Sequence, residues 1–339
     1  MNSNDIRRAV EQRWNSLTKP PGSLGRLEEA ITRLAIQQGT PNPSLDRKAI
    51  YLFCGDHGIT AEGVSAYPGE VTRQMMLNFV HGGAAISVLC RRMNIRTVIV
   101  DAGVKGEPVE GTLNHRIGEG TRNFALEPAM TREQAQRALD AGAAIAHANS
   151  EDIRAAGEMG IGNTTSASAL LCVLTGADPF DAAGPGTGLA PDGVRRKAET
   201  IARAIAFHKP DPSDPIGVLA QFGGFEIAMM TGLLIASARQ RIPVMMDGFI
   251  SCSAALVAQA IEPAAAGNLI YSHQSAEPAH ARMLTALGAQ PLFDLAMRLG
   301  EGTGAALGIS LLEHALALYN GMATFAQAAV SGPDAKADG

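Results

Sequence analysis

The stretch KAIYLFCGDHG, residues 48–58, decides the fold class of this chain. Its six uncharged, mostly apolar residues (49–54) stop abruptly at Gly-Asp-His-Gly. A short continuous apolar run of this kind is typical of a parallel strand that is buried on both faces of a sheet. The polar residues that follow the run are then expected at the carboxyl end of the strand.

The same pattern recurs further along the chain. The other runs are RTVIVDAGV (96–104), IPVMMDGF (242–249) and NLIYSHQS (268–275), with a further strand expected within EDIRAAGEMGIGN (151–163). Helical periodicity fills the intervals at 84–93, 132–148, 164–176 and 225–240. Strands that alternate with helices predict an α/β fold with a Rossmann-like open parallel sheet, right-handed crossovers and helices on its flanks.

Both ends of the chain read as helix. The expected helices are 3–19, with Ser3 as N-cap and a stop before Pro20, 22–39, 281–288, 292–300 and 304–329. We therefore expect a large α/β domain over 40–280 and a small helical domain made from 1–39 plus 281–330. The polar tail 331–339 is expected to be frayed.

Composition narrows the classes of function. The chain has 339 residues, a net charge of −5 and 4% aromatic residues, which argues against a nucleic-acid partner. Its four cysteines lack a Cys-x-x-Cys pair and indicate free thiols in a reducing compartment. The N-terminus lacks an apolar signal core and no apolar run is long enough for a membrane span, so a cytoplasmic protein without a membrane partner is expected.

Polar side chains gather where the predicted strands end. In open parallel sheets, ligands bind outside the carboxyl ends of the strands. A single polar residue there can be a cap or a partner of a neighbouring loop, but several together indicate a site. These residues are Asp56, His57, Asp101, Glu158, Asp247, Ser272 and His273.

Two glycine-rich segments suit an anion. GNTTSASALLC (162–172) opens a helix, whose free N–H groups favour a phosphate, although an ordinary threonine cap would look the same. AGPGTGLAPDGVRRKAE (183–199) fails as a dinucleotide fingerprint, because prolines flank its glycines and no acidic residue follows at the right distance. It suits a loop around a ribose phosphate with a lysine behind it, although its arginines could equally belong to a solvated helix face.

A third glycine-rich segment, RLGEGTGAALG (298–308), carries a carboxylate in its middle, Glu301. A phosphate-binding loop would not favour that charge. A glutamate in a dry, glycine-lined pocket suits a general base for a weakly acidic N–H. The alternative is a glutamate that caps the helix expected after it. The sequence thus predicts a site with anion-binding loops at one end and a carboxylate at the other.

Eight motifs together resemble one family, the nicotinate-nucleotide–dimethylbenzimidazole phosphoribosyltransferases. They occur in the family's order, and the ordered set is highly specific although no single motif is. The motifs are KPPGSLGRLE (19–28), GDHG (55–58), EGVSAYPGEVT (62–72), GEMGIGNTT (157–165), GPGTGL (184–189), MDGFISCSAAL (246–256), SHQSAE (272–277) and RLGEGTGAAL (298–307).

The resemblance implies an activity. The family transfers the phosphoribosyl group of nicotinate mononucleotide to 5,6-dimethylbenzimidazole, which yields α-ribazole 5′-phosphate and nicotinate for the lower ligand of cobalamin. It also implies a homodimer, a Rossmann-like sheet with a small helical domain from both chain ends, and a reaction that needs no metal or cofactor.

The resemblance also assigns roles to residues. Glu301 corresponds to the catalytic glutamate and Glu158 to a second one. The implied phosphate and ribose contacts are Gly160, Gly162, Asn163, Thr164, Thr165, Gly186, Thr187, Gly188 and Lys197. The residues expected around the base are Tyr67, Met75, Asp247 and Ser272. Some family members have a small hydroxyl residue in place of Tyr67, so base stacking is expected while base selectivity stays open.

Two other functions remain open from the residues alone. A metal-dependent phosphohydrolase would use Asp56, His57, Asp101 and Asp247, and a chelator would abolish its activity. A non-catalytic protein that binds a nucleotide or benzimidazole would show affinity without turnover. The glutamate loop together with two phosphate-type loops favours the transferase over both.

Overall fold

The computed structural model describes residues 1–332 and divides into two compact units. The large unit is Arg47–Gly308, and the small unit joins Met1–Asp46 to the chain from Ile309 onward. Residues 281–308, expected in the small domain, thus belong to the large unit, where α12 (His280–Ala286) packs against α11 (Phe249–Ile261). Of the tail expected to be frayed, residues 333–339 lie outside the described part.

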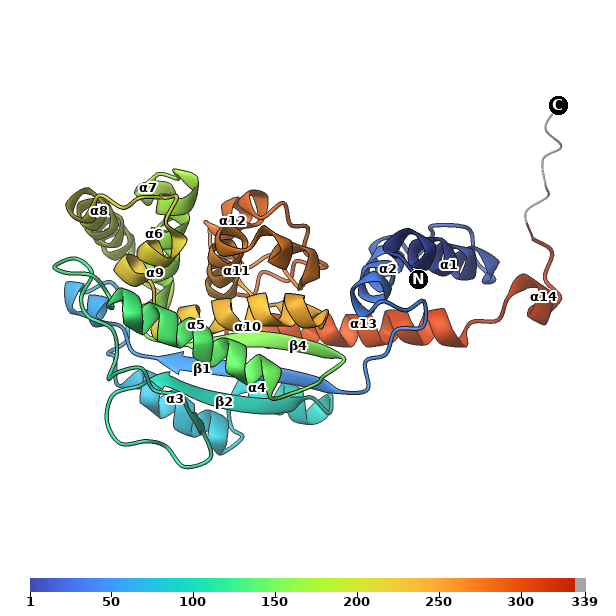
Figure 1. Cartoon of the computed structure of the whole chain (residues 1–339), viewed down its shortest axis with the longest axis horizontal. Coiled ribbons are helices and arrows are strands. Elements are labelled where there is room, and N and C mark those ends of the chain that lie inside the picture. The colour runs from blue at the N-terminus through green and yellow to red at the C-terminus, as the bar shows by residue number, and fades with distance from the viewer. Residues whose placement is uncertain (333–339) are drawn as a thin grey trace. The chain divides into compact units, whose positions relative to one another are not determined.

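A six-stranded sheet forms the centre of the large unit (Figure 1). All neighbouring strands are parallel, and their order is β3-β2-β1-β4-β5-β6. The strands are β1 (Lys48–Gly55), β2 (Arg96–Gly103), β3 (Leu113–Asn114), β4 (Ile153–Met159), β5 (Val244–Met246) and β6 (Leu269–Tyr271). The expected open parallel sheet is confirmed. Its order reverses between β1 and β4, which is where such sheets leave a crevice for ligands.

Helices cover both faces of this sheet. Helices α3 and α10 both contact β1, β2 and β4, and they lie on opposite sides of it (Figure 1). Besides α11 and α12, the unit contains α3 (Val71–Val80), α4 (Ala85–Arg92), α5 (Arg132–His147), α6 (Asn163–Thr175), α7 (Pro179–Ala182), α8 (Pro191–His208), α9 (Pro215–Phe222), α10 (Phe225–Gln240) and the 3₁₀ turns η1 (Gly58–Glu62) and η2 (Pro263–Asn268).

Two glycines allow α5 and α10 to approach closely. A Cβ atom on Gly142 would lie 1.9 Å from the carbonyl oxygen of Met229, and one on Gly232 would lie 1.9 Å from that of Leu139. Neither oxygen can move away, because both belong to helix backbone. Because neither glycine has a side chain, the backbones of α5 and α10 touch directly, and this contact sets the distance between the two helices.

Replacing Gly232 by alanine is expected to lower the free energy of unfolding by about 2 kcal/mol or more, because overpacking outweighs the roughly 1 kcal/mol gain in helix propensity. Urea unfolding of the two proteins measures the difference. Gly267→Ala is the control, since nothing lies within 4 Å of its added Cβ. Equal stability of Gly232→Ala and wild type would contradict the contact.

The small unit is helical. It contains α1 (Ser3–Ser16), α2 (Arg26–Gln38), α14 (Phe325–Ala328) and the later part of α13 (Thr303–Gly321). Trp14 packs edge-on against Tyr319 with 4.9 Å between ring centroids. Lys19, in the loop that joins α1 to α2, places its Nζ 2.7 Å from Oε1 of Glu28 in the first turn of α2.

Three expectations about helices were wrong in detail. Asn2, not Ser3, caps α1, because its side chain accepts a hydrogen bond from the N–H of Asp5. The expected helix 304–329 is split after Gly321, and Thr324 starts a separate short helix with a capping box. The expected helix 292–300 does not form: Phe293 donates its N–H to Ser272 O and accepts from Gln274 N, so this segment pairs with the chain beyond β6.

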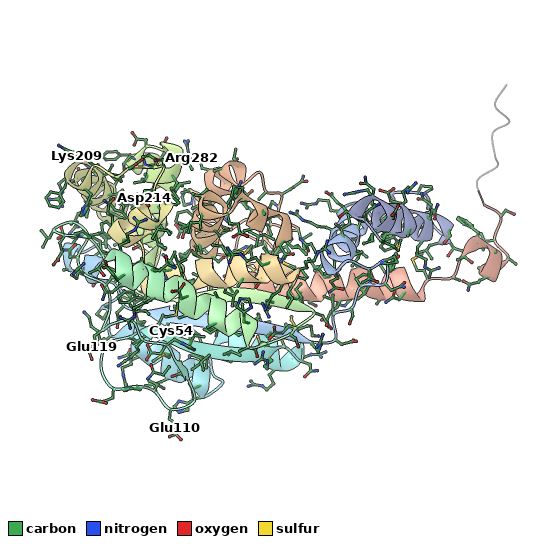
Figure 2. All side chains as sticks on the ribbon, viewed as in Figure 1. Cys54, Glu110, Glu119, Lys209, Asp214 and Arg282 are labelled. Atoms are coloured by element: carbon green, nitrogen blue, oxygen red, sulfur yellow. The ribbon has the colours of Figure 1, made fainter. Side chains whose placement is uncertain are left out.

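The four cysteines, Cys54, Cys90, Cys172 and Cys252, are buried and unpaired. Burial raises the pKa of the Cys54 thiol well above its usual range. Figure 2 labels Cys54 within the large unit, whereas Glu110 and Glu119 lie on its surface. No helix within residues 1–332 has the length and apolar character needed to cross a membrane.

Candidate active site

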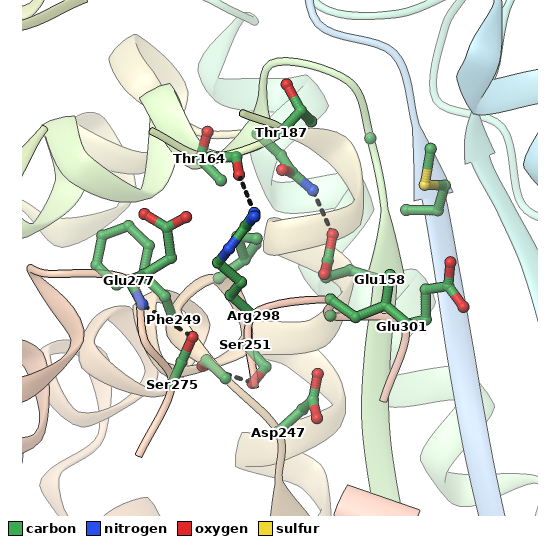
Figure 3. Close-up of a pocket in the computed structure, with 18 of the residues that line it drawn as sticks. Glu158, Thr164, Thr187, Asp247, Phe249, Ser251, Ser275, Glu277, Arg298 and Glu301 are labelled. Carbon is green, nitrogen blue, oxygen red and sulfur yellow. Dashed lines mark hydrogen bonds between the residues drawn. The ribbon is translucent and has the colours of Figure 1, made fainter. Parts of the chain in front are cut away.

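A cavity of about 680 Å³ opens at the carboxyl ends of β4, β5 and β6 (Figure 3). Glu158 reaches it from β4, Asp247 from the end of β5 and His273 from the chain after β6. Met75 on α3 and the loop before α13 complete the wall. The parallel register places all three strand ends at one edge of the sheet, which is why residues far apart in sequence meet here.

The cavity brings together most of the residues expected at the site. Those that line it are Tyr67, Met75, Glu158, Gly160, Asn163, Thr164, Gly186, Thr187, Asp247 and Glu301. Five others do not line it. They are Gly162, Thr165, Gly188, Lys197 and Ser272. Ser272 is fully buried and donates to Asp247 O at 3.4 Å, and Thr165 is fully buried within α6.

Glu301 is held in an unusual conformation. Its φ of 61° lies in the left-handed region, which a residue with a Cβ rarely adopts, and its side chain is 6% exposed. The carboxyl oxygen Oε2 is buried without a hydrogen-bond partner among the described residues. Burial, aided by the nearby Asp247, raises the pKa of Glu301 to about 7. A carboxyl group with this pKa and a free oxygen can accept a proton from a ligand near neutral pH.

Asp247, not Glu301, caps α13. Its Oδ2 accepts from the N–H of Gly302 at 3.1 Å and its Oδ1 accepts from that of Ala305 at 3.0 Å. The helix N-terminus is therefore already supplied with a carboxylate, which removes the capping interpretation of Glu301. A Cβ on Gly304 would lie 2.2 Å from His273 Cδ2 and 2.9 Å from Asp247 Oδ1, so this turn requires glycine.

Glu158 lies at the end of β4 and accepts a hydrogen bond from the side-chain amide of Asn163. Burial and the negative charges of Asp247, Glu226 and Glu301 together raise the pKa of Glu158 to about 8, against the opposing effect of the Asn163 hydrogen bond. Glu158, Asp247, Glu277 and Glu301 thus bring four carboxyl groups to one cavity. The neutral form of Glu158 is favoured at neutral pH.

The raised pKa of Glu158 makes the stability of the folded protein depend on pH. Since Glu158 ionises at about 8 in the folded protein but near 4.5 when unfolded, its contribution is present at low pH and is lost as pH rises between those values. Glu158→Gln is therefore expected to stabilise the protein at pH 8.5 by up to about 4 kcal/mol, and at pH 5 by about 1 kcal/mol or less. Denaturant unfolding at both pH values measures this. The exposed Glu199→Gln is the control, and an equal effect at both pH values would argue against the shift.

The opposite wall is built around the start of α6. Lys197 on α8 is fully buried, and its Nζ donates to Thr164 Oγ1 at 2.8 Å and to Gly184 O at 3.2 Å. Burial lowers the pKa of Lys197 to about 8. A Cβ on Gly186 would lie 2.8 Å from Thr164 Oγ1 and 3.4 Å from Lys197 Nζ. Because that Cβ is missing, a ligand against Gly186 can come within reach of the lysine.

Three of the four residues of the phosphohydrolase alternative, Asp56, His57 and Asp101, do not line the cavity, whereas Asp247 does. Asp56 accepts from the N–H of Lys105 at 2.8 Å, and Asp101 accepts from the N–H of Val104 at 2.9 Å and from the Arg116 guanidinium at 2.8 Å. Within residues 1–332, no three His, Cys, Asp or Glu side chains are grouped so that they could hold a metal ion.

His57 forms part of a buried chain of side chains rather than of the cavity. Its Nε2 lies 2.5 Å from Glu226 Oε1 and its Nδ1 lies 3.1 Å from Ser166 Oγ. Although these residue types match a hydrolytic triad, all three are buried and do not line the cavity, and a Cβ on Gly160 would lie 3.3 Å from His57 Cδ2. No sequence pattern indicated the Ser166 or Glu226 contacts, since they join distant segments.

Comparison with known proteins decides the family. A family profile described as phosphoribosyltransferase matches residues 1–330. This chain belongs to that family. The nicotinate-nucleotide–dimethylbenzimidazole phosphoribosyltransferase of Pseudomonas fluorescens is 51% identical over 330 residues, which cover 95% of this chain and 94% of the relative. The protein of the same name from Roseiflexus sp. is 47% identical over 329 residues, which cover 96% and 93%.

A solved structure supports the same assignment for this phosphoribosyltransferase. CobT from Thermus thermophilus is 44% identical and superposes with a TM-score of 0.92, covering 96% of this chain and 99% of that one. The resemblance inferred from the motifs is thereby confirmed at the level of family and fold.

Some residues of the phosphoribosyltransferase cavity were missed by the reasoning from sequence. Arg298 and Glu277 line it, as do Phe249, Ser251 and Ser275. Arg298 opens the motif RLGEGTGAAL and Glu277 closes SHQSAE, so their membership of quoted motifs was the available signal. Figure 3 shows the Arg298 side chain pointing toward Thr164, with Glu277 on one side and Glu158 and Glu301 on the other.

Proposed function

We propose that this chain transfers the phosphoribosyl group of nicotinate mononucleotide to 5,6-dimethylbenzimidazole with inversion at C1′. The products are α-ribazole 5′-phosphate and nicotinate, and the reaction supplies the lower-ligand nucleotide of cobalamin. The observation that carries the proposal is the buried, unpartnered Oε2 of Glu301 in the cavity. The names of the two relatives indicate the substrates.

The chemistry demands little from the leaving group. The pyridinium nitrogen of nicotinate mononucleotide is cationic, so nicotinate departs with a neutral ring nitrogen and needs no acid. The benzimidazole attacks C1′ through one nitrogen while its other nitrogen loses a proton. In this proposal Glu301 accepts that proton, which fits a carboxyl group whose pKa is about 7.

The remaining residues position the substrates. The phosphate lies against Gly186 and Thr164 with Lys197 behind them, the ribose lies near Glu158, and the base lies against Tyr67 and Met75. Attack on the face of C1′ opposite nicotinate converts the β configuration into α. Holding the two reactants in this geometry can contribute several kcal/mol of the lowered barrier.

The proposal predicts how the rate depends on pH. Only ionised Glu301 can take the proton, so kcat is expected to fall as pH drops through about 7. Above about pH 8 the neutral form of Lys197 is expected to weaken binding of nicotinate mononucleotide, which lowers kcat/KM. Initial rates from pH 5.5 to 9.5 measure both the fall in kcat at low pH and the fall in kcat/KM at high pH. A kcat independent of pH between 5.5 and 8 would contradict Glu301 as the base.

The assembly and location of the protein are part of the same proposal. We expect a cytoplasmic homodimer that requires no cofactor. The four buried, unpaired cysteines support a reducing compartment. Sedimentation velocity of the purified chain tests the dimer, and a single species at the mass of one chain would exclude it.

Acceptor-dependent release of nicotinate tests the function itself. The purified protein with nicotinate mononucleotide is expected to release nicotinate quickly only when 5,6-dimethylbenzimidazole is present, and without added metal. Release of nicotinate at the same rate with and without the benzimidazole would mean hydrolysis, with water as the acceptor. Tight binding of both compounds without any release would mean a carrier.

A further inference from the structure

The wall that we assign to the phosphate also contains a carboxylate. Glu277 lines the cavity together with Gly186, Thr164 and Arg298, and its side chain is 7% exposed. The proposed reaction gives this residue no role. A carboxylate beside a phosphate repels it when both are ionised, which would weaken phosphate binding.

Glu277 is fixed against the phosphate loop. A Cβ on Gly184 would lie 2.2 Å from Glu277 Oε2, so the carboxylate touches the backbone at a position that only glycine can occupy. The backbone N–H of Gly186 lies near the same carboxylate and lowers its pKa. Ser275 Oγ accepts from the N–H of Glu277 at 3.2 Å, and Ser275 N donates to His280 Nδ1 at 2.7 Å, so the backbone that carries Glu277 is held in place.

The wall around Glu277 carries more positive than negative charge. Lys197 and Arg298 are the cations that face it, and His280 is neutral because burial lowers its pKa to about 3. Lys197 directs its N–H groups to the neutral oxygens of Thr164 and Gly184 rather than to Glu277. An ionised Glu277 therefore leaves a net charge of +1 in this wall, whereas a protonated Glu277 leaves +2, which matches a phosphate dianion.

The pKa of the Glu277 carboxyl group lies above its usual value in the protein without ligand. Burial raises the pKa of its carboxyl group, while Lys197, the Gly186 N–H and Arg298 oppose that rise. A phosphate would draw the two cations and the amide toward itself and add negative charge nearby. Each of these changes raises the pKa further.

We propose that Glu277 takes up a proton from the solvent when the phosphate of nicotinate mononucleotide binds. The proton returns to solvent when the phosphorylated product leaves. This inference rests on the proposed function, because it takes the phosphate position from it. With phosphate bound, protonated Glu277 leaves the wall with a charge of +2, which balances the phosphate dianion. Without ligand, ionised Glu277 lowers that charge to +1.

Calorimetry can measure the proton directly. The full-length protein is titrated with nicotinate mononucleotide at pH 7.0 in PIPES and in imidazole buffer, whose ionisation heats differ. At this pH, neutral Lys197 contributes an uptake of about 0.1 proton, and the protonated fraction of the phosphate contributes a release of about 0.1, so the two cancel. Glu301 and Glu158 also titrate near this pH, but their contribution is common to wild type and Glu277→Gln. We expect an uptake of about 0.5–1 proton per site from Glu277, measured as the difference between the two proteins. Nicotinate riboside, which lacks the phosphate, should show no such difference.

Glu277→Gln tests the assignment to this residue. Glutamine keeps the size and an acceptor for the Gly186 N–H, and it should abolish the uptake. The ratio of the wild-type Kd to the variant Kd should rise up to about tenfold between pH 7 and pH 8, since the Lys197 contribution is common to both proteins. Glu199→Gln, on the same helix as Lys197 but exposed, should behave like wild type. A purely structural role would instead weaken the variant equally at all pH values.

The outcomes separate this inference from the function on which it rests. The same proton uptake in wild type and in Glu277→Gln would overturn the role of Glu277 while leaving the transferase intact. If nicotinate mononucleotide neither binds nor turns over, the proposed function fails and the inference fails with it.

Discussion

Replacing Glu301 by glutamine is expected to lower kcat by about 10²–10⁴-fold, with a much smaller change in KM for either substrate. Glutamine has nearly the same shape and can occupy the same dry space, but it cannot accept the proton of the benzimidazole. Steady-state rates of nicotinate release measure the effect. Since the charge of Glu301 is disfavoured in the fold, the variant should be no less stable than wild type above pH 7.

The acidity of the acceptor separates a general base from a residue that only shapes the cavity. A benzimidazole carrying electron-withdrawing substituents has a more acidic N–H and depends less on a base. The loss caused by Glu301→Gln should therefore shrink with such acceptors. A near-normal turnover of the variant with 5,6-dimethylbenzimidazole, or an equal loss for all acceptors, would show that Glu301 is not the base.

Replacing Lys197 by methionine is expected to weaken binding of nicotinate mononucleotide by about 10²–10³-fold, because a buried charge that meets a phosphate contributes about 2–5 kcal/mol. Affinity for 5,6-dimethylbenzimidazole alone should change little. Calorimetric titrations of the two compounds measure both effects at pH 7.

Stability supplies the control for Lys197. Burial lowers the pKa of this lysine to about 8, which means that its charge is disfavoured in the ligand-free fold at neutral pH. Lys197→Met should therefore unfold at the same or higher denaturant concentration, with a gain of up to about 3 kcal/mol. A variant that is both unstable and weak in binding would indicate that Lys197 mainly supports the fold.

The large unit was largely predictable because buried parallel strands have a strong signal. The runs at 48–58 and 96–104 are apolar on both faces and end in polar residues, as a doubly covered sheet requires. The same logic located the site, since Glu158 and Asp247 follow strands that share an edge. The strand pattern does not show how deeply each side chain is buried. Lys197 was therefore expected to contact the ligand, but it lies behind Gly186.

The misses have local physical causes. The segment 292–300 has helical composition, but the chain beyond β6 offers it backbone partners, and pairing with Ser272 and Gln274 prevails over its intrinsic propensity. The choice between Glu301 and another cap for α13 could not be made from sequence, because Asp247 is 54 positions away in the chain and only the fold brings it to the helix. Glu277 was overlooked because nothing in SHQSAE distinguishes a cavity carboxylate from a surface one.

The most direct test of the central claim is the identity of the product. The protein is incubated with nicotinate mononucleotide and 5,6-dimethylbenzimidazole, and the products are separated by chromatography and examined by mass spectrometry and NMR. We predict equal amounts of nicotinate and a benzimidazole riboside 5′-phosphate with the α configuration at C1′. Nicotinate accompanied by ribose 5-phosphate, or a product that retains the β configuration, would contradict direct attack by the benzimidazole in this cavity.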